Sequence, residues 1–125
     1  MGKKILIVDD DPDFIMTTGM VLKSAGYEVV EALSGKEGLE KSKQEEPDLY
    51  IVDLMMETYS EGAKLAETLN EDEKTADKPK IMITSVDIKG PWSSYGQDQK
   101  ISFDHVLQKP VSPDVLLKYV KKVLG

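Results

Sequence analysis

The side chains best suited to chemistry each follow or end a short apolar run with the character of a buried strand. They are three acids, a hydroxyl and an ammonium: Asp9, Asp10, Asp53, Thr84 and Lys109. In open α/β sheets the carboxyl ends of parallel strands meet at one edge, where ligands bind, so we expect these side chains to converge. Alone, each has an ordinary explanation as a helix cap, turn residue or surface charge. Their joint placement after four strands indicates a site.

Three carboxylates held close together repel one another, and a hard divalent cation removes that cost. Mg²⁺ prefers carboxylate, carbonyl and water oxygens. Held by Asp10, Asp53 and a backbone carbonyl just after Asp53, it would keep positions open for phosphoryl oxygens. A carboxylate in such a site can act as a nucleophile and form an acyl phosphate. The metal, the Lys109 ammonium and the Thr84 hydroxyl would then meet the charge on the transferred group.

The elements that must position these side chains follow from the apolar pattern. Five apolar runs have the length and β-branched content of strands, at residues 4–8, 27–32, 49–52, 80–84 and 105–107. Helical spacing predicts a helix with Asp11 as its N-cap, Pro12 in its first turn and a stop at Gly26. The same signals predict helices over 35–44, around 63–69, and from 112 to the C-terminus. This alternation of strands and helices predicts an α/β sandwich with a parallel sheet.

Composition narrows the class of protein further. The chain has 125 residues, with 16 Lys and Arg against 23 Asp and Glu, and a formal net charge of −7. We therefore predict one domain over residues 1–125, without an output domain, and no direct contact with nucleic acid. The lack of Cys and the single His exclude disulfides, thiol catalysis and His-rich metal sites. No apolar run is long enough to cross a bilayer, so we expect a cytoplasmic protein without membrane insertion.

Four motifs, in this order and spacing, make the chain resemble the receiver domain of two-component response regulators over about residues 3–123. They are ILIVDDDP at 5–12, LYIVDLMM at 49–56, IMITS at 81–85 and LQKP at 107–110. The resemblance implies a flavodoxin-like three-layer sandwich, with a five-stranded parallel sheet in the order 2-1-3-4-5.

The same resemblance implies a role for each matching position. Asp53 would be the phosphoacceptor, taking a phosphoryl group from the phosphohistidine of a sensor histidine kinase or a phosphotransfer protein. Asp10 would bind Mg²⁺ directly and Asp9 mostly through water, while the Met55 carbonyl would be a main-chain ligand. The protein would catalyse only its own phosphorylation and dephosphorylation, and phosphorylation would control binding to a downstream protein or onward transfer of the phosphate.

Three further positions complete the implied site. Thr84 would contact the phosphoryl group and shift with phosphorylation. Lys109 would pair with Asp53 before phosphorylation and with a phosphoryl oxygen after it. Pro110 would occupy the family's cis-peptide position.

The chain departs from the family pattern at several places. Glu57 stands where family members commonly carry Pro, and Val106 stands at the position of the usual switch aromatic. Residues 85–101 lack helical periodicity and contain Gly90-Pro91, so we expect the family's fourth helix to be short or irregular.

Two alternative functions from other classes are open. The first is a pseudo-receiver that binds a partner through residues 85–101 without phosphorylation, with Trp92 and Tyr95 as docking aromatics. The second is a small phosphatase or phosphotransferase of a related fold. The second would need a further acid and a capping element, neither of which is evident. The acids, the Thr and the Lys favour a phosphoaccepting, stand-alone receiver over both.

Overall fold

The structure is a computed structural model that describes residues 3–53, 65, 68–84, 104–109 and 111–124. Its strands are β1 (Lys4–Val8), β2 (Glu28–Ala32), β3 (Leu49–Asp53), β4 (Lys80–Thr84) and β5 (His105–Gln108). Its helices are α1 (Pro12–Ser24), α2 (Gly35–Glu45) and α4 (Pro113–Leu124). Residues 65 and 68–71 are also helical, and they overlap the helix predicted around 63–69. The irregular segment predicted at 85–101 lies outside the described residues.

The five strands form one parallel sheet in the order β2-β1-β3-β4-β5. The prediction of a parallel α/β sheet in the order 2-1-3-4-5 is therefore confirmed. The strand bounds differ from the predicted ones by one residue at most, and β3 extends to include Asp53. That extension makes the candidate phosphoacceptor the last residue of a central strand.

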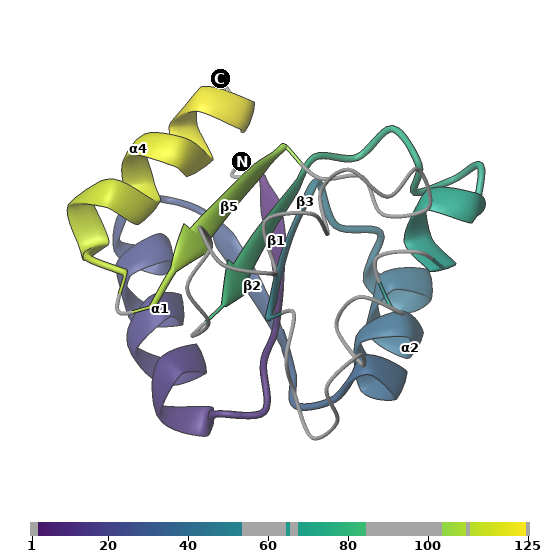
Figure 1. Cartoon of the computed structure of the whole chain (residues 1–125), viewed down its shortest axis with the longest axis horizontal. Coiled ribbons are helices and arrows are strands. Elements are labelled where there is room, and N and C mark those ends of the chain that lie inside the picture. The colour runs from purple at the N-terminus through teal and green to yellow at the C-terminus, as the bar shows by residue number, and fades with distance from the viewer. Residues whose placement is uncertain (1–2, 54–64, 66–67, 85–103, 110, 125) are drawn as a thin grey trace.

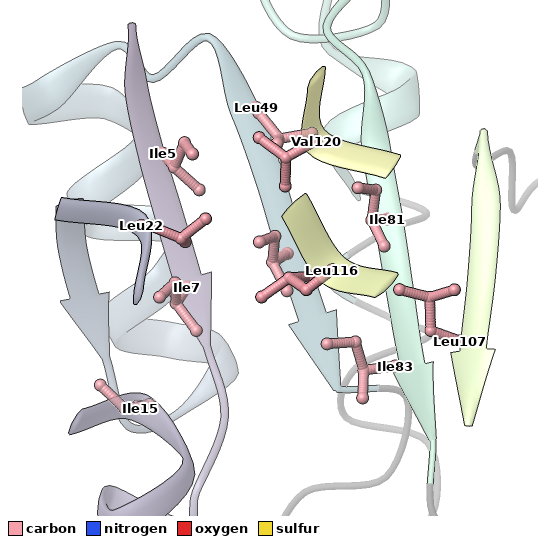
Figure 2. Packing of buried hydrophobic residues seen from close by; sticks show 11 residues of the cluster. Ile5, Ile7, Ile15, Leu22, Leu49, Ile81, Ile83, Leu107, Leu116 and Val120 are labelled. Carbon is pink, nitrogen blue, oxygen red and sulfur yellow. The ribbon is translucent and has the colours of Figure 1, made fainter. Parts of the chain in front are cut away.

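Helices cover both faces of the sheet, with α1 and α4 on one side and α2 on the other (Figure 1). Alternate residues of β1 and β3 supply the two cores, because successive strand residues point to opposite faces. On the α1 and α4 side, Figure 2 shows Ile5 and Ile7 of β1 in one layer with Leu116 and Val120 of α4. On the other side lie Leu6, Val8, Ala32, Tyr50, Val52, Leu65, Leu69 and Met82. Strands buried on both faces are typical of parallel sheets.

The helix ends follow the predicted chemistry. Asp11 caps α1, and Ser34 caps α2 by accepting a hydrogen bond from the Glu37 N–H at 3.1 Å. Gly26 has a φ of 98°, a conformation in which glycine carries no side-chain penalty, and it reverses the chain after α1. Within the described residues, no helix is long and apolar enough to span a membrane.

Candidate functional site

Three acids meet at the carboxyl edge of the two central strands. Val8 and Val52 are register partners, so Asp9, which follows β1, and Asp53, which ends β3, lie side by side. Asp9 and Asp53 are buried, with 1% and 5% of their surface exposed, and Asp10 is exposed. One carboxylate oxygen from each of the three lies within 4.8 Å of the other two. The structure therefore brings together all three acids that the sequence placed at this edge.

The backbone fixes Asp9 in this position. Its N–H donates to the Ala32 carbonyl at 3.1 Å, which extends the β1–β2 ladder by one residue. Its Oδ1 accepts a hydrogen bond from the Asp11 N–H at 2.9 Å. Asp11 itself accepts from the N–H groups of Asp13 and Phe14, at 3.0 and 3.4 Å. The prediction that Asp11 is a helix cap is confirmed, and the tight turn from β1 into α1 leaves Asp9 and Asp10 at the sheet edge.

Lys109, just after β5, reaches across the edge to two of these acids. Its Nζ lies 2.8 Å from Asp9 Oδ2 and 3.4 Å from Asp53 Oδ2. Burial by itself lowers the pKa of Lys109, but the hydrogen bond that Lys109 donates to Asp9 and the charge of Asp53 outweigh the effect of burial, and the net effect raises the pKa. Lys109 is therefore a cation at neutral pH that is held between two buried carboxylates.

The donor set fits a hard divalent cation. Asp9, Asp10 and Asp53 offer only oxygen, at separations that one ion can span. One ammonium opposes three carboxylates, so the cluster keeps a formal negative charge that a cation would neutralise. Softer metals that prefer sulfur or imidazole have no such ligand in this cluster. Asp9, Asp10 and Asp53 are thus the residues that could hold Mg²⁺.

The remaining predicted site residues are placed only in part. Thr84 is the last residue of β4 and pairs in register with Gln108, so its backbone lies at the same edge as Asp53 and Lys109. Met55 and Pro110 lie outside the described residues, so their roles stay predictions.

One residue next to the site was not predicted from the sequence. Lys109 Nζ lies 4.4 Å from the centroid of the Phe14 ring, within the range of a cation–π contact. In the sequence, Phe14 has the spacing of the apolar face of α1, and the structure does pack it, half-buried, against the core. Its second contact could not be inferred from spacing, since Phe14 and Lys109 meet only through the tertiary fold.

Comparison with known proteins identifies the class of protein that this fold and site define. The model of the response regulator receiver domain family matches residues 5–121. The chain therefore belongs to that family, whose members act in two-component signalling.

The chain is also similar to solved receivers, such as a CheY-like receiver domain protein from Methanospirillum hungatei JF-1. That structure has a TM-score of 0.82 and 32% identity, over 98% of this chain and 93% of the other. Chemotaxis response regulator CheY4 of Vibrio cholerae has a TM-score of 0.86 and 27% identity, over 98% and 99% of the two chains.

Curated relatives fall into two sizes. The phosphate regulon transcriptional regulatory protein PhoB of Pseudomonas aeruginosa is 36% identical over 99% of this chain, but only 52% of PhoB is covered. RpaA of Synechocystis is 34% identical, and 48% of it is covered. The chain thus spans about half the length of these two relatives. Protein PilH of Pseudomonas aeruginosa, in contrast, is 31% identical over 98% of both chains, so this chain is also similar to receivers of its own size.

Proposed function

We propose that the protein is a phosphorylation-controlled receiver in which Asp53 accepts a phosphoryl group from the phosphohistidine of a sensor histidine kinase or a phosphotransfer protein. The observation that carries this proposal is the position of Asp53, a buried acid at the end of β3 with two acids and one lysine around it. No catalytic turnover of another substrate is required. A cytoplasmic location remains a prediction that goes with this donor.

The transfer forms one bond and breaks one. A carboxylate oxygen of Asp53 attacks the phosphorus, the P–N bond to the donor imidazole breaks, and that nitrogen keeps the electron pair and takes up a proton. The product is a mixed anhydride on Asp53. Mg²⁺, held by Asp10 and Asp53 with Asp9 close by and the Met55 carbonyl as a further ligand, would neutralise charge on the phosphoryl oxygens.

Lys109 supplies the second positive charge. Its ammonium already lies 3.4 Å from Asp53 Oδ2, so a phosphoryl group on Asp53 would arrive within its reach. Phosphorylation adds close to two negative charges at this position. The pairing of Lys109 with Asp9 and Asp53 then competes with pairing to the new oxygens, in which Thr84 takes part from the end of β4. We infer that this competition shifts the loops at the sheet edge and so controls the binding of a downstream protein.

Replacement of the acceptor tests the proposal. Wild-type protein is incubated with acetyl phosphate in Mg²⁺, and uptake of acid-labile phosphate is followed by intact mass. We expect wild-type protein to be labelled, labelling to disappear in EDTA, and Asp53→Asn to take up none. Asp13→Asn is the matched control, because Asp13 is an exposed acid in the first turn of α1 outside the cluster, and it should behave as wild type.

Two results would contradict this function. Equal labelling of Asp53→Asn would place the acceptor elsewhere. Absence of labelling in the wild type, together with no measurable Mg²⁺ affinity, would leave the alternative of a pseudo-receiver that docks through residues 85–101.

A further inference from the structure

The Lys109 ammonium has partners of two different kinds. Two are the carboxylates of Asp9 and Asp53, at 2.8 and 3.4 Å. The third is the face of the Phe14 ring, whose centroid lies 4.4 Å from Nζ. The ring quadrupole attracts a cation, and the ring also keeps water from the side of the ammonium that it covers.

The first turn of α1 holds Phe14 in place from two directions. Its backbone N–H donates to the capping carboxylate of Asp11 at 3.4 Å. Its side chain is half-buried and packs against the core cluster that contains Ile7, Ile15 and Leu107. The ring is therefore part of the fixed frame of the domain, whereas Lys109 reaches it through a flexible four-carbon side chain.

We infer that Phe14 is a positioning residue for Lys109. Its ring holds the ammonium beside Asp9 and Asp53, where the phosphoryl group arrives. This inference rests on the proposed function. A π face attracts the ammonium without offering a lone pair that would hold an N–H in a fixed direction. The N–H donors are thus left for Asp9, Asp53 and, after transfer, a phosphoryl oxygen. A third carboxylate in place of the ring would compete with these acceptors instead.

The alternative role of Phe14 is simple packing, and the substitutions separate the two. Phe14→Leu keeps an apolar side chain against the core but removes the ring, while Phe14→Tyr keeps the ring. Tyr119→Leu is the matched control, because it removes a half-buried ring from α4 that contacts His105, not Lys109. Urea unfolding of each variant shows which are folded under the assay conditions.

Two measurements on these variants test the inference. In the unphosphorylated protein labelled with ¹³C-lysine, we expect the ε-methylene resonance of Lys109 to be shifted upfield by the ring. The resonance is assigned by its loss in Lys109→Arg. The shift should vanish in Phe14→Leu and persist in Phe14→Tyr and Tyr119→Leu. With acetyl phosphate and Mg²⁺, Phe14→Leu should be phosphorylated more slowly by roughly two- to thirtyfold, the range that corresponds to a cation–π contact. Phe14→Tyr should restore most of the rate.

The outcomes that overturn the inference differ from those that overturn the proposed function. An unchanged Lys109 resonance in Phe14→Leu refutes the contact, and equal rates for Phe14→Leu and wild type refute the positioning role. Equal slowing in Phe14→Tyr and Phe14→Leu would show that packing alone matters. If wild-type protein takes up no phosphate at all, the proposed function fails and the role in transfer fails with it, while the lysine resonance still decides whether ring and ammonium meet.

Discussion

Removal of the Lys109 ammonium leaves two buried carboxylates without their cation, and Lys109→Met is the substitution that does this at nearly constant volume. At an effective dielectric constant of about 20, unit charges separated by 2.8 and 3.4 Å attract one another by roughly 6 and 5 kcal/mol. Desolvation offsets much of this attraction, and breaking a buried pair typically costs about 3–5 kcal/mol. Because 20% of the Lys109 side chain stays exposed, we expect Lys109→Met to lower the free energy of unfolding by about 2–4 kcal/mol at neutral pH without Mg²⁺.

Mg²⁺ should reduce this loss, since it neutralises the same carboxylates. At a free concentration of about 100 times its Kd, a ligand that binds only the folded state adds about 2.7 kcal/mol to stability. Lys109→Met should gain more from Mg²⁺ than wild type does, because no ammonium competes for Asp9 and Asp53. Urea unfolding of both proteins, in EDTA and in Mg²⁺, measures the four free energies that this comparison needs.

Lys4→Met is the matched control for the loss of an ion pair far from the site. Lys4 Nζ lies 3.2 Å from Glu45 Oε1, with 29% and 38% of the two side chains exposed. An exposed pair of this kind contributes about 0–1 kcal/mol, and its loss should not depend on Mg²⁺. If Lys109→Met costs no more than Lys4→Met, or costs the same in EDTA and in Mg²⁺, the reasoning about a cation-dependent carboxylate cluster is wrong.

Two further predictions concern packing at Gly38 and the burial of Tyr50. A Cβ on Gly38 of α2 would lie 2.9 Å from Val8 Cγ2 and 3.2 Å from Leu65 Cδ2. Crowding should cost about 1–3 kcal/mol, and the higher helix propensity of Ala should return about 1 kcal/mol. Gly38→Ala should therefore lower the free energy of unfolding by about 0–2 kcal/mol. The cost should shrink in the Val8→Ala background, and strictly additive effects in urea unfolding would contradict the crowding. The second prediction follows from the burial of Tyr50, which raises the pKa of its phenol above 10.0. The unfolded chain then ionises first, so stability falls as the pH rises above 10, and Tyr50→Phe should reduce that fall. Equal pH dependence of the two proteins in urea unfolding around and above pH 10 would refute this origin.

The sequence pattern alone predicted that the acids and Lys109 lie at one edge of the sheet, because the rule behind this prediction holds for parallel sheets in general. Asp9, Asp53 and Lys109 each follow or end an apolar run, and parallel strands bring such positions to one side of the sheet. The contact between Asp9 and Asp53 needs β1 beside β3, and that order came from the resemblance to receivers, not from the pattern of apolar residues. The structure then added the distances, which show that Lys109 pairs with Asp9 as well as with Asp53.

Contacts that depend on side-chain packing were beyond the sequence. Lys80 has the appearance of a charged residue that opens a strand, yet it is 2% exposed, and its Nζ donates to the Thr75 and Lys78 carbonyls at 3.0 and 2.9 Å. Burial lowers its pKa. His105 is half-buried, and its ring centroid lies 4.6 Å from that of Tyr119 in α4. The contacts of Lys80 depend on the path of the turn that contains Thr75 and Lys78, and the contact of His105 depends on the position of α4. The spacing of apolar residues predicts neither.

The unequal distances of Lys109 bear on how the site changes state. The ammonium lies closer to Asp9, at 2.8 Å, than to Asp53, at 3.4 Å, so it pairs most closely with an acid that is itself a candidate cation ligand. A divalent cation held by Asp9, Asp10 and Asp53 would weaken both ion pairs of Lys109, and the Phe14 ring would remain as a partner of the ammonium. The attraction of the ring does not depend on the charge state of any acid, so the ring would keep the ammonium beside the acceptor when the cation binds. On this basis the ring should matter more to Lys109 in Mg²⁺ than in EDTA, and Phe14→Leu should enlarge the effect of Mg²⁺ on the environment of Lys109.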